Sequence, residues 1–401
     1  MYIIARNIAR NKKKSLITIL VCTFLVTAVN IYLGNMQSNR NQLMNLPEVM
    51  PVYCQITNLN GSKSTGIWID EVLAGSLITS SQVKDAAYGI RMMGGIGDFP
   101  DEERREMLTL SVEGVSCMEA VPGLTWENLE LNQGEDSFFQ SSDAKCIVSS
   151  ALMKKQQWKR GQEIPLNLYY YDYNDEEGIH CYPLEILNVT IVGEMDIVAE
   201  GVGAMPPDIL IPIGLLRESY ARENVPFQPS HFSFYVADPL ALNDFKAEMK
   251  ALGLMERNVM ANDSFEGCAL NVRDTVFVSM ADKLQKTIQI FESFLGIICL
   301  TILGVAYIVS TLLMDSRVRE FALIRAMGSS TLKCMAILWT EQLCLILTGF
   351  LIGDAICLLF QNISTVLFSD AMIAVPYMAG CTVALLRTGK RSTMQLLFAA
   401  Q

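Results

Sequence analysis

The chain has 401 residues, of which 51% are hydrophobic and 18% are charged, and its formal net charge is −11. A soluble globular chain carries about 25% charged residues, and here Asp and Glu are scarce in the first 47 residues and after residue 286. This distribution excludes a uniformly acidic soluble enzyme, a nucleic-acid-binding protein with a basic domain, and a disordered chain. It predicts a membrane protein with a large water-exposed middle segment.

Four apolar stretches approach the roughly 20 residues that cross a bilayer core. They predict membrane-spanning helices at residues 15–35, 288–314, 333–360 and 371–387. A cleaved signal peptide is the alternative for the first stretch, but its apolar run continues to Leu33, which favours an uncleaved anchor.

Basic residues next to these spans predict the orientation of the chain. Twelve Lys and Arg residues lie in the N-terminal segment 1–14, in the connection 315–332 together with Lys333, and in the tail after the fourth span (388–401 with Arg387). These twelve residues face only two acidic residues. Residues 36–286 instead carry 19 basic and 36 acidic residues. Both termini and the connection 315–332 are therefore expected in the cytoplasm, with 36–286 and the short loop 361–370 outside.

The middle segment, residues 36–286, alternates short strand-like runs with amphipathic runs, which predicts an extracytoplasmic α/β or α+β domain between the first two spans. A helix capped near Ser80 or Ser81 is expected between the first two strands, and helices are expected at two further places. The predicted strands and helices are Val52–Asn58, Ala87–Met92, Cys146–Ser149, Ala151–Lys159 closed by Gly161, Leu187–Glu194, Ile209–Ile213, Phe232–Val236 and Leu240–Leu252.

No pattern in the chain indicates catalysis. His180 and His231 are the only histidines and neither belongs to a metal or catalytic signature. No Gly-x4-Gly-Lys-Ser/Thr motif is present, so the chain is not expected to hydrolyse ATP itself. The 11 cysteines include no Cys-x-x-Cys, which favours reduced, buried thiols and leaves one or two disulfides open. We expect a non-enzymatic chain with no metal and no directly bound cofactor.

The connection 315–332 carries the most informative pattern. Residues 317–327 are helix-forming, Gly328 suits a C-terminal cap, and Ser329 or Ser330 can cap the next helix. Apolar residues occur all round this short helix, whereas a helix exposed to water has one polar face. One side can lie on the membrane lipid while the other needs a partner. An interfacial helix with no partner is the alternative.

Residues 319–328, Arg-Glu-Phe-Ala-Leu-Ile-Arg-Ala-Met-Gly, resemble the REIGILRALG element of FtsX-like, MacB-type ABC transporter permeases. The resemblance extends to the basic segment Ala5–Lys14 before the first span. It also covers parts of the middle segment: Cys146–Met153, the Gly161 turn, Val189–Glu194 and Ile209–Pro212.

The resemblance implies a permease subunit that works with a second copy or a paralogue and with a separate cytoplasmic ABC ATPase, which uses the ATP. It implies a bacterial plasma-membrane protein that moves its outer domain to export or extract peptides, lipids or lipoproteins. A regulator acting on an extracellular cell-wall hydrolase or sensor, and an anchored binding protein without an ATPase, remain alternatives. The residues implied to couple to the ATPase are Arg317, Val318, Arg319, Glu320, Phe321, Ile324, Arg325, Met327 and Gly328.

Three further features concern the spans and the middle segment. Gly349 and Gly353 allow close helix approach, either within the bundle or between two copies. Glu341 and Asp354 are intramembrane carboxylates, a type of residue that ordinarily indicates function. The excess of acidic residues in 36–286 is explained equally by attraction of cationic peptides and by solubility.

Overall fold

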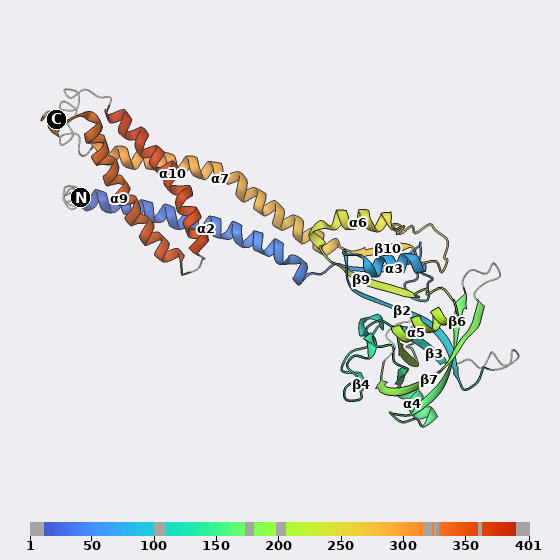
Figure 1. Ribbon diagram of the computed structural model, residues 1–401. Helices are drawn as coiled ribbons and strands as arrows, with labels where there is room; N and C mark the ends of the chain where they lie inside the picture. The colour runs from blue at the N-terminus through green and yellow to red at the C-terminus, as the bar shows by residue number, and fades with distance from the viewer. Residues whose placement is uncertain are drawn as a thin grey trace. The chain divides into compact units, whose positions relative to one another are not determined.

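The computed structural model describes residues 12–99, 110–172, 180–197, 206–315, 323–324, 327, 329–359 and 363–389. The chain divides into two compact units (Figure 1). Met1–Leu46 with Val278–Gln401 form the helical unit, and Pro47–Phe277 form the inserted domain.

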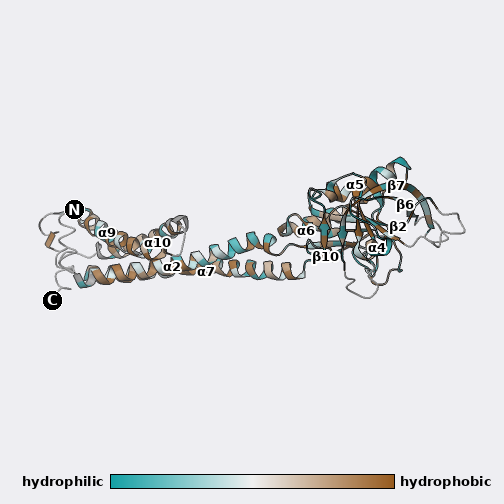
Figure 2. Cartoon of the chain, turned by 90° about the horizontal axis from the view of Figure 1, so that it is seen from below, coloured by the Kyte–Doolittle hydropathy of each residue, from teal (hydrophilic) through white to brown (hydrophobic). Residues whose placement is uncertain are grey.

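The described residues of the helical unit form four long helices: α2 (Lys12–Val49), α7 (Thr275–Asp315), α9 (Thr331–Cys357) and α10 (Ile363–Gly389). Each contains a stretch long and apolar enough to cross a membrane, and Figure 2 shows these stretches as predominantly brown. The prediction of four spanning helices is confirmed.

Helices α2 and α7 are longer than the spans expected from hydropathy. Helix α2 ends at Val49 rather than near residue 35, and α7 begins at Thr275 rather than near residue 288. The added turns are rich in polar residues, which can continue a helix without adding to its apolar content. Hydropathy therefore detects the membrane-crossing part of each helix and not its extension.

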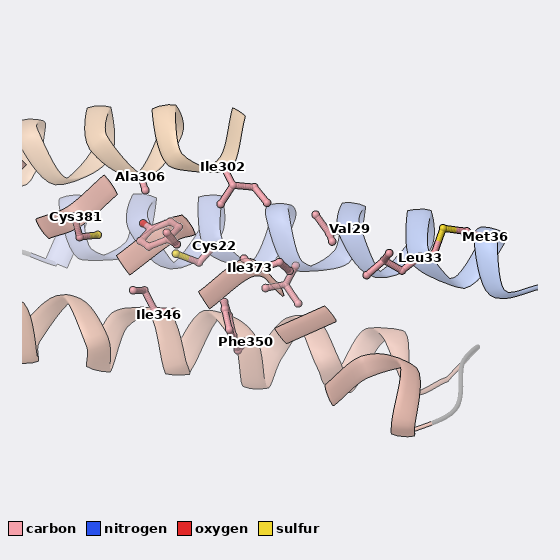
Figure 3. Packing of buried hydrophobic residues seen from close by; sticks show 12 residues of the cluster. Cys22, Val29, Leu33, Met36, Ile302, Ala306, Ile346, Phe350, Ile373 and Cys381 are labelled. Carbon is pink, nitrogen blue, oxygen red and sulfur yellow. The ribbon is translucent and has the colours of Figure 1, made fainter. Parts of the chain in front are cut away.

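All four helices contribute to one buried cluster in the helical unit (Figure 3). Lipid tails are as apolar as the side chains, so packing and interhelical hydrogen bonds hold such a bundle together rather than hydrophobic burial. The cluster includes Cys22, Val26 and Val29 of α2, Ile302 and Ala306 of α7, Ile346 and Phe350 of α9, and Ile373, Tyr377 and Cys381 of α10.

The described part of the inserted domain contains a ten-stranded mixed sheet. Pairings β2–β3, β3–β8, β8–β5, β5–β7, β7–β6 and β6–β2 close a ring of six strands, while β9, β1 and β10 continue outward from β2. The strands are β1 (Tyr53–Thr57), β2 (Val83–Ile96), β3 (Leu110–Val115), β4 (Leu129–Leu131), β5 (Lys145–Ser149), β6 (Glu163–Asp172), β7 (His180–Met195), β8 (Ile209–Pro212), β9 (His231–Val236) and β10 (Ala269–Arg273).

The helices of this domain begin at side-chain caps where the sequence supplies them. Asp70 accepts hydrogen bonds from the backbone N–H groups that open α3 (Glu71–Thr79), and Ser149 caps α4 (Ser150–Gln156). Two more helices are α5 (Ile213–Arg222) and α6 (Leu242–Ala251). Strands and helices thus alternate between the first and second spanning helices, which confirms the predicted mixed α/β class.

Individual elements agree with the predictions at most positions, and Ser80 is the C-terminal cap residue of α3. Helix α4 ends earlier than expected, because Gln157 adopts a left-handed backbone conformation with φ of 57°. Gly161, which was expected to close it, has φ of 83° in the turn that leads into β6.

Candidate coupling site

The described part of the connection between α7 and α9 is the end of a helical turn. The Met327 N–H donates to the Leu323 carbonyl at 3.0 Å, and the Ser329 N–H donates to the Ile324 carbonyl, five residues back, at 3.4 Å. This second bond is the one that closes a Schellman cap. The Ser330 hydroxyl then accepts the Lys333 N–H at 3.4 Å and caps α9. The helical turn is therefore followed directly by α9.

Two sides of this turn have different surroundings. Ile324 is half-buried and packs against Cys334, together with Met335 and Leu338 of α9. Leu323 and Met327 are 58% and 78% exposed. Of the apolar residues implied to contact an ATPase, Ile324 thus contacts the chain itself and Met327 is exposed. The other implied coupling residues lie outside the described residues: Arg317, Val318, Arg319, Glu320, Phe321, Arg325 and Gly328.

Gly349 and Gly353 lie where α9 crosses α2. A Cβ atom on Gly349 would be 2.5 Å from the Cβ of Cys22, and one on Gly353 would be 2.8 Å from a methyl carbon of Val26. The Thr23 hydroxyl donates to the Gly349 carbonyl at 3.3 Å. Both glycines therefore serve close packing within one bundle, the first of the two predicted alternatives.

A second close approach joins α10 to α7, and the sequence analysis had not found it. A Cβ atom on Gly380 would be 2.5 Å from the Leu303 carbonyl oxygen and 2.9 Å from the Cβ of Ala306. The Arg387 guanidinium of α10 donates to the Tyr307 hydroxyl of α7. Gly380 lacks a second glycine four residues away, so no GxxxG pattern marks it in the sequence.

The intramembrane carboxylates of α9 are not both fully buried. Glu341 is buried and Asp354 is half-buried. Ser369 of α10 donates to the Asn30 amide oxygen of α2. This buried hydrogen bond joins α10 to α2.

Helices α2 and α7 are also clamped to each other. The Tyr32 hydroxyl donates to the Phe291 carbonyl, and the two rings meet edge to face with centroids 4.9 Å apart. Arg40 forms an ion pair with Glu292. These four residues lie in or near the predicted spans, and hydropathy alone gives no reason to pair them.

Both long helices continue into neighbouring strands of the inserted domain. Helix α2 is followed by β1 after residues 50–52, and β10 is separated from α7 by Asp274 alone. Strands β1 and β10 pair antiparallel along their whole length.

This strand pair is reinforced within the domain. The Arg273 guanidinium lies 5.3 Å from the centroid of the Tyr53 ring, and Tyr53 meets Tyr235 of β9 edge to face. Lys246 of α6 forms an ion pair with Asp274 at 2.6 Å. The strands to which α2 and α7 connect are therefore held in place by contacts within the domain.

No group of three or more His, Cys, Asp or Glu side chains suited to a metal ion occurs among the described residues. All 11 cysteines lie in the described part of the chain and are free thiols. Burial raises the pKa of the Cys54 and Cys146 thiols to about 12, so both are protonated and unreactive at neutral pH.

Comparison with known proteins identifies the C-terminal half of the helical unit. Residues 292–386 match the family model "FtsX-like permease C-terminal". No curated protein sequence matches the chain.

Solved structures that are similar to part of the chain include three domains. The periplasmic region of MacB from Actinobacillus actinomycetemcomitans is 9% identical, with a TM-score of 0.32, over 60% of this chain and 93% of that one. The extracellular domain of the noncanonic ABC-type transporter YknZ from Gram-positive bacteria is 14% identical, with a TM-score of 0.27, over 55% and 98%. A domain of a putative permease from Porphyromonas gingivalis is 14% identical, with a TM-score of 0.30, over 55% and 88%. At these TM-scores the likeness supports no further inference.

Proposed function

Because residues 292–386 match the FtsX-like permease C-terminal family model, we propose that the chain is an FtsX-like permease and the membrane subunit of an ATP-driven ABC transporter. In this proposal a separate cytoplasmic ABC ATPase supplies the energy, and the inserted domain lies outside the membrane. The chain passes movement between them, and the work done outside is export or extraction of peptides, lipids or lipoproteins. A second copy or a paralogue completes the transporter.

The exposed side of the turn before α9 is the observation that carries this proposal. Leu323 and Met327 are 58% and 78% exposed, while Ile324 holds the same turn against α9. Exposed apolar side chains on a turn fixed in this way are suited to seating in a partner protein. Because the capped turn is followed directly by α9, a push on the turn would reach α9 and would not be absorbed by a flexible loop.

Two long helices lead to the inserted domain. Helix α7 is one helix of 41 residues, and the Tyr32–Phe291 and Arg40–Glu292 contacts join it to α2. Both helices connect by short segments to the paired strands β1 and β10. Continuous helices transmit displacement because every backbone hydrogen bond in them resists bending.

The basic residues near the ends of the spans support the proposed orientation. Three separate clusters, before α2, between α7 and α9, and after α10, carry the same sign. Such residues are retained on the cytoplasmic side of a membrane. The strongly acidic middle segment is then the part that crosses to the outside.

The double substitution L323D and M327D tests the proposal. It places two carboxylates on the exposed side of the turn and leaves the Ile324 contact with α9 in place. We expect the variant to insert normally and to lose the ABC ATPase that co-purifies with the native chain, measured as ATP hydrolysis in the purified complex. Charged groups buried unpaired in an apolar interface cost about 3 kcal/mol or more, which corresponds to at least a hundredfold weaker binding.

The matched control is M260D, because Met260 is 93% exposed and belongs to the inserted domain. This variant should retain the ATPase in full. Retention of the ATPase by the double variant would show that the turn is not the coupling element.

A further inference from the structure

The inserted domain contains a pocket of about 300 Å³ that the coupling mechanism does not use. Its walls come from three parts of the domain that are far apart in the sequence. Arg91 lies on β2, Tyr170 to Asp172 end β6, and Tyr220 to Gln228 cover the end of α5 and the loop after it. This volume is at the lower end of the range for ligand sites in proteins, which begins at about 300 Å³, and it suits a single side chain or a small head group.

Aromatic rings hold one side of the pocket in place. The Tyr170 ring lies 6.2 Å from Tyr220 and 5.8 Å from Tyr182, measured between centroids. Tyr220 meets Phe227 edge to face at 5.8 Å, and the Arg217 guanidinium lies 4.9 Å from the centroid of the Phe227 ring. These contacts fix the rings before any ligand enters, so binding need not pay for ordering them.

The positive charge of Arg91 is neutralised by a buried carboxylate on the neighbouring strand. Arg91 pairs with Glu113 of β3 at 3.4 Å, and the Glu113 side chain is only 4% exposed. The other Glu113 oxygen lies 3.4 Å from Nδ1 of His231. Burial lowers the pKa of His231, so this ring is neutral at pH 7 and adds no positive charge.

Two more carboxylates, Asp172 and Glu223, line the same pocket. With Arg91 balanced by Glu113, the lining has an excess of negative charge beside tyrosine rings. An ammonium or guanidinium group is attracted to the face of an aromatic ring and to carboxylates at the same time. An anion would have to displace Glu113 from Arg91 and approach two further carboxylates.

We propose that this pocket binds the cationic side chain, Arg or Lys, of a peptide outside the membrane. Tyr170 and Tyr220 supply the aromatic wall, and Asp172 and Glu223 supply the charge. The proposal deepens the proposed function by giving the transporter a basic peptide as ligand, and it rests on that function only for the side of the membrane on which the domain lies. Binding at the pocket does not require the ATPase.

The test uses the full chain in lipid nanodiscs and three peptides that differ in one side chain. These are acetyl-Gly-Arg-Gly-amide, its citrulline analogue, which has the same shape and no charge, and its Glu analogue. Saturation-transfer NMR titrations give the three dissociation constants. We expect the Arg peptide to bind about tenfold or more tightly than the citrulline peptide. Equal binding of these two, or tighter binding of the Glu peptide, would overturn the proposal.

Variants locate the binding in the pocket. Glu223 is exposed, so E223Q removes a charge without disturbing the fold, and Y170L removes one ring of the wall. Each should weaken binding of the Arg peptide about three- to tenfold. The control E256Q changes an exposed glutamate elsewhere in the domain and should leave binding unchanged. If E223Q and E256Q bind alike, the pocket is not the site.

Ethylguanidinium, which carries the charged group without a peptide backbone, tests whether the ligand of the pocket is a peptide. Weaker binding than the Arg peptide supports a peptide ligand, while equal or tighter binding contradicts it. The E223Q variant should still co-purify with the ATPase. Loss of peptide binding with the ATPase retained would therefore leave the proposed function intact, and the two ideas can fail separately.

Discussion

A polar cluster of the inserted domain joins the buried Glu113 and His231 to the half-buried Arg91 on three adjacent strands. Arg91 and Glu113 are direct partners in the pairing of β2 with β3, and His231 is the partner of Gly89 in the pairing of β2 with β9. A Cβ atom on Gly89 would be 2.5 Å from Cε1 of His231. Gly89 is therefore the residue that makes room for a buried imidazole at this point of the sheet.

This cluster makes the stability of the domain dependent on pH. Burial lowers the pKa of His231, an effect that the Glu113 carboxylate opposes in part. The neutral ring therefore stabilises the fold above its ordinary pKa of about 6.5, and this contribution is lost as the pH falls below that value. The unfolding midpoint of the domain should drop between pH 7.5 and pH 5.5, and H231Q should reduce the drop.

The other histidine of the chain provides the control for this prediction. His180 begins β7 and is not fully buried, so H180Q should keep the pH dependence of the native chain. The measurement is thermal unfolding followed by tyrosine and tryptophan fluorescence. A pH profile in H231Q that matches the native profile would remove His231 from the explanation.

At the scale of the elements, the packing of α9 on α2 depends on Gly349. G349A places a Cβ atom 2.5 Å from the Cβ of Cys22 and 3.3 Å from the Ile19 carbonyl oxygen. Neither neighbour is the flexible end of a side chain, so the helices must separate. We expect a loss of about 1–3 kcal/mol in the free energy of unfolding, measured by titrating the micelle-solubilised chain with a denaturing detergent.

G296A on α7 is the matched control, because no atom lies within 4 Å of the position of its added Cβ. Its effect should stay within about 0.5 kcal/mol, as for substitutions away from close contacts. If the two variants unfold alike, close approach at Gly349 does not stabilise the bundle.

The sequence predicted the spanning helices well because each element carries its own signal. Long apolar runs marked α2, α7, α9 and α10, and the GxxxG pattern marked the close contact of α9. Short apolar or alternating runs marked β1, β5, β8 and β9. Strands β3, β4, β6 and β10 and helix α5 were not predicted. Strand β6 pairs with two partners and carries three tyrosines near its end, so its pattern is set by neighbours distant in the sequence.

The candidate sites were also predicted only where a single segment carried its own signal. The connection before α9 was found because its composition is unusual within one short segment. The α2–α7 clamp and the pocket were not found, because their residues come from distant parts of the chain and none is unusual alone. Arg40 and Glu292 are 252 positions apart, and a charged residue beside a span gives no hint of its partner.

At the scale of the whole molecule, two helices of the bundle are continuous with the inserted domain and two are not. Helices α2 and α7 connect along the chain to β1 and β10. Helices α9 and α10 follow α7 in the chain and have no connection to a strand. In the proposed transporter α7 has contact with both ends of the mechanism, since the connection that follows it meets the ATPase and the strand that precedes it belongs to the inserted domain. This connectivity requires the connection and the domain to lie on opposite sides of the membrane.

The most direct measurement labels single introduced cysteines with a membrane-impermeant maleimide. The variants are M260C in the inserted domain and M327C in the turn before α9, both at exposed positions, with the native chain as the blank for its own thiols. We predict that M260C is labelled in intact cells. We predict that M327C is labelled only in inside-out vesicles, where bound ATPase reduces the labelling. Labelling of M327C in intact cells would contradict the account.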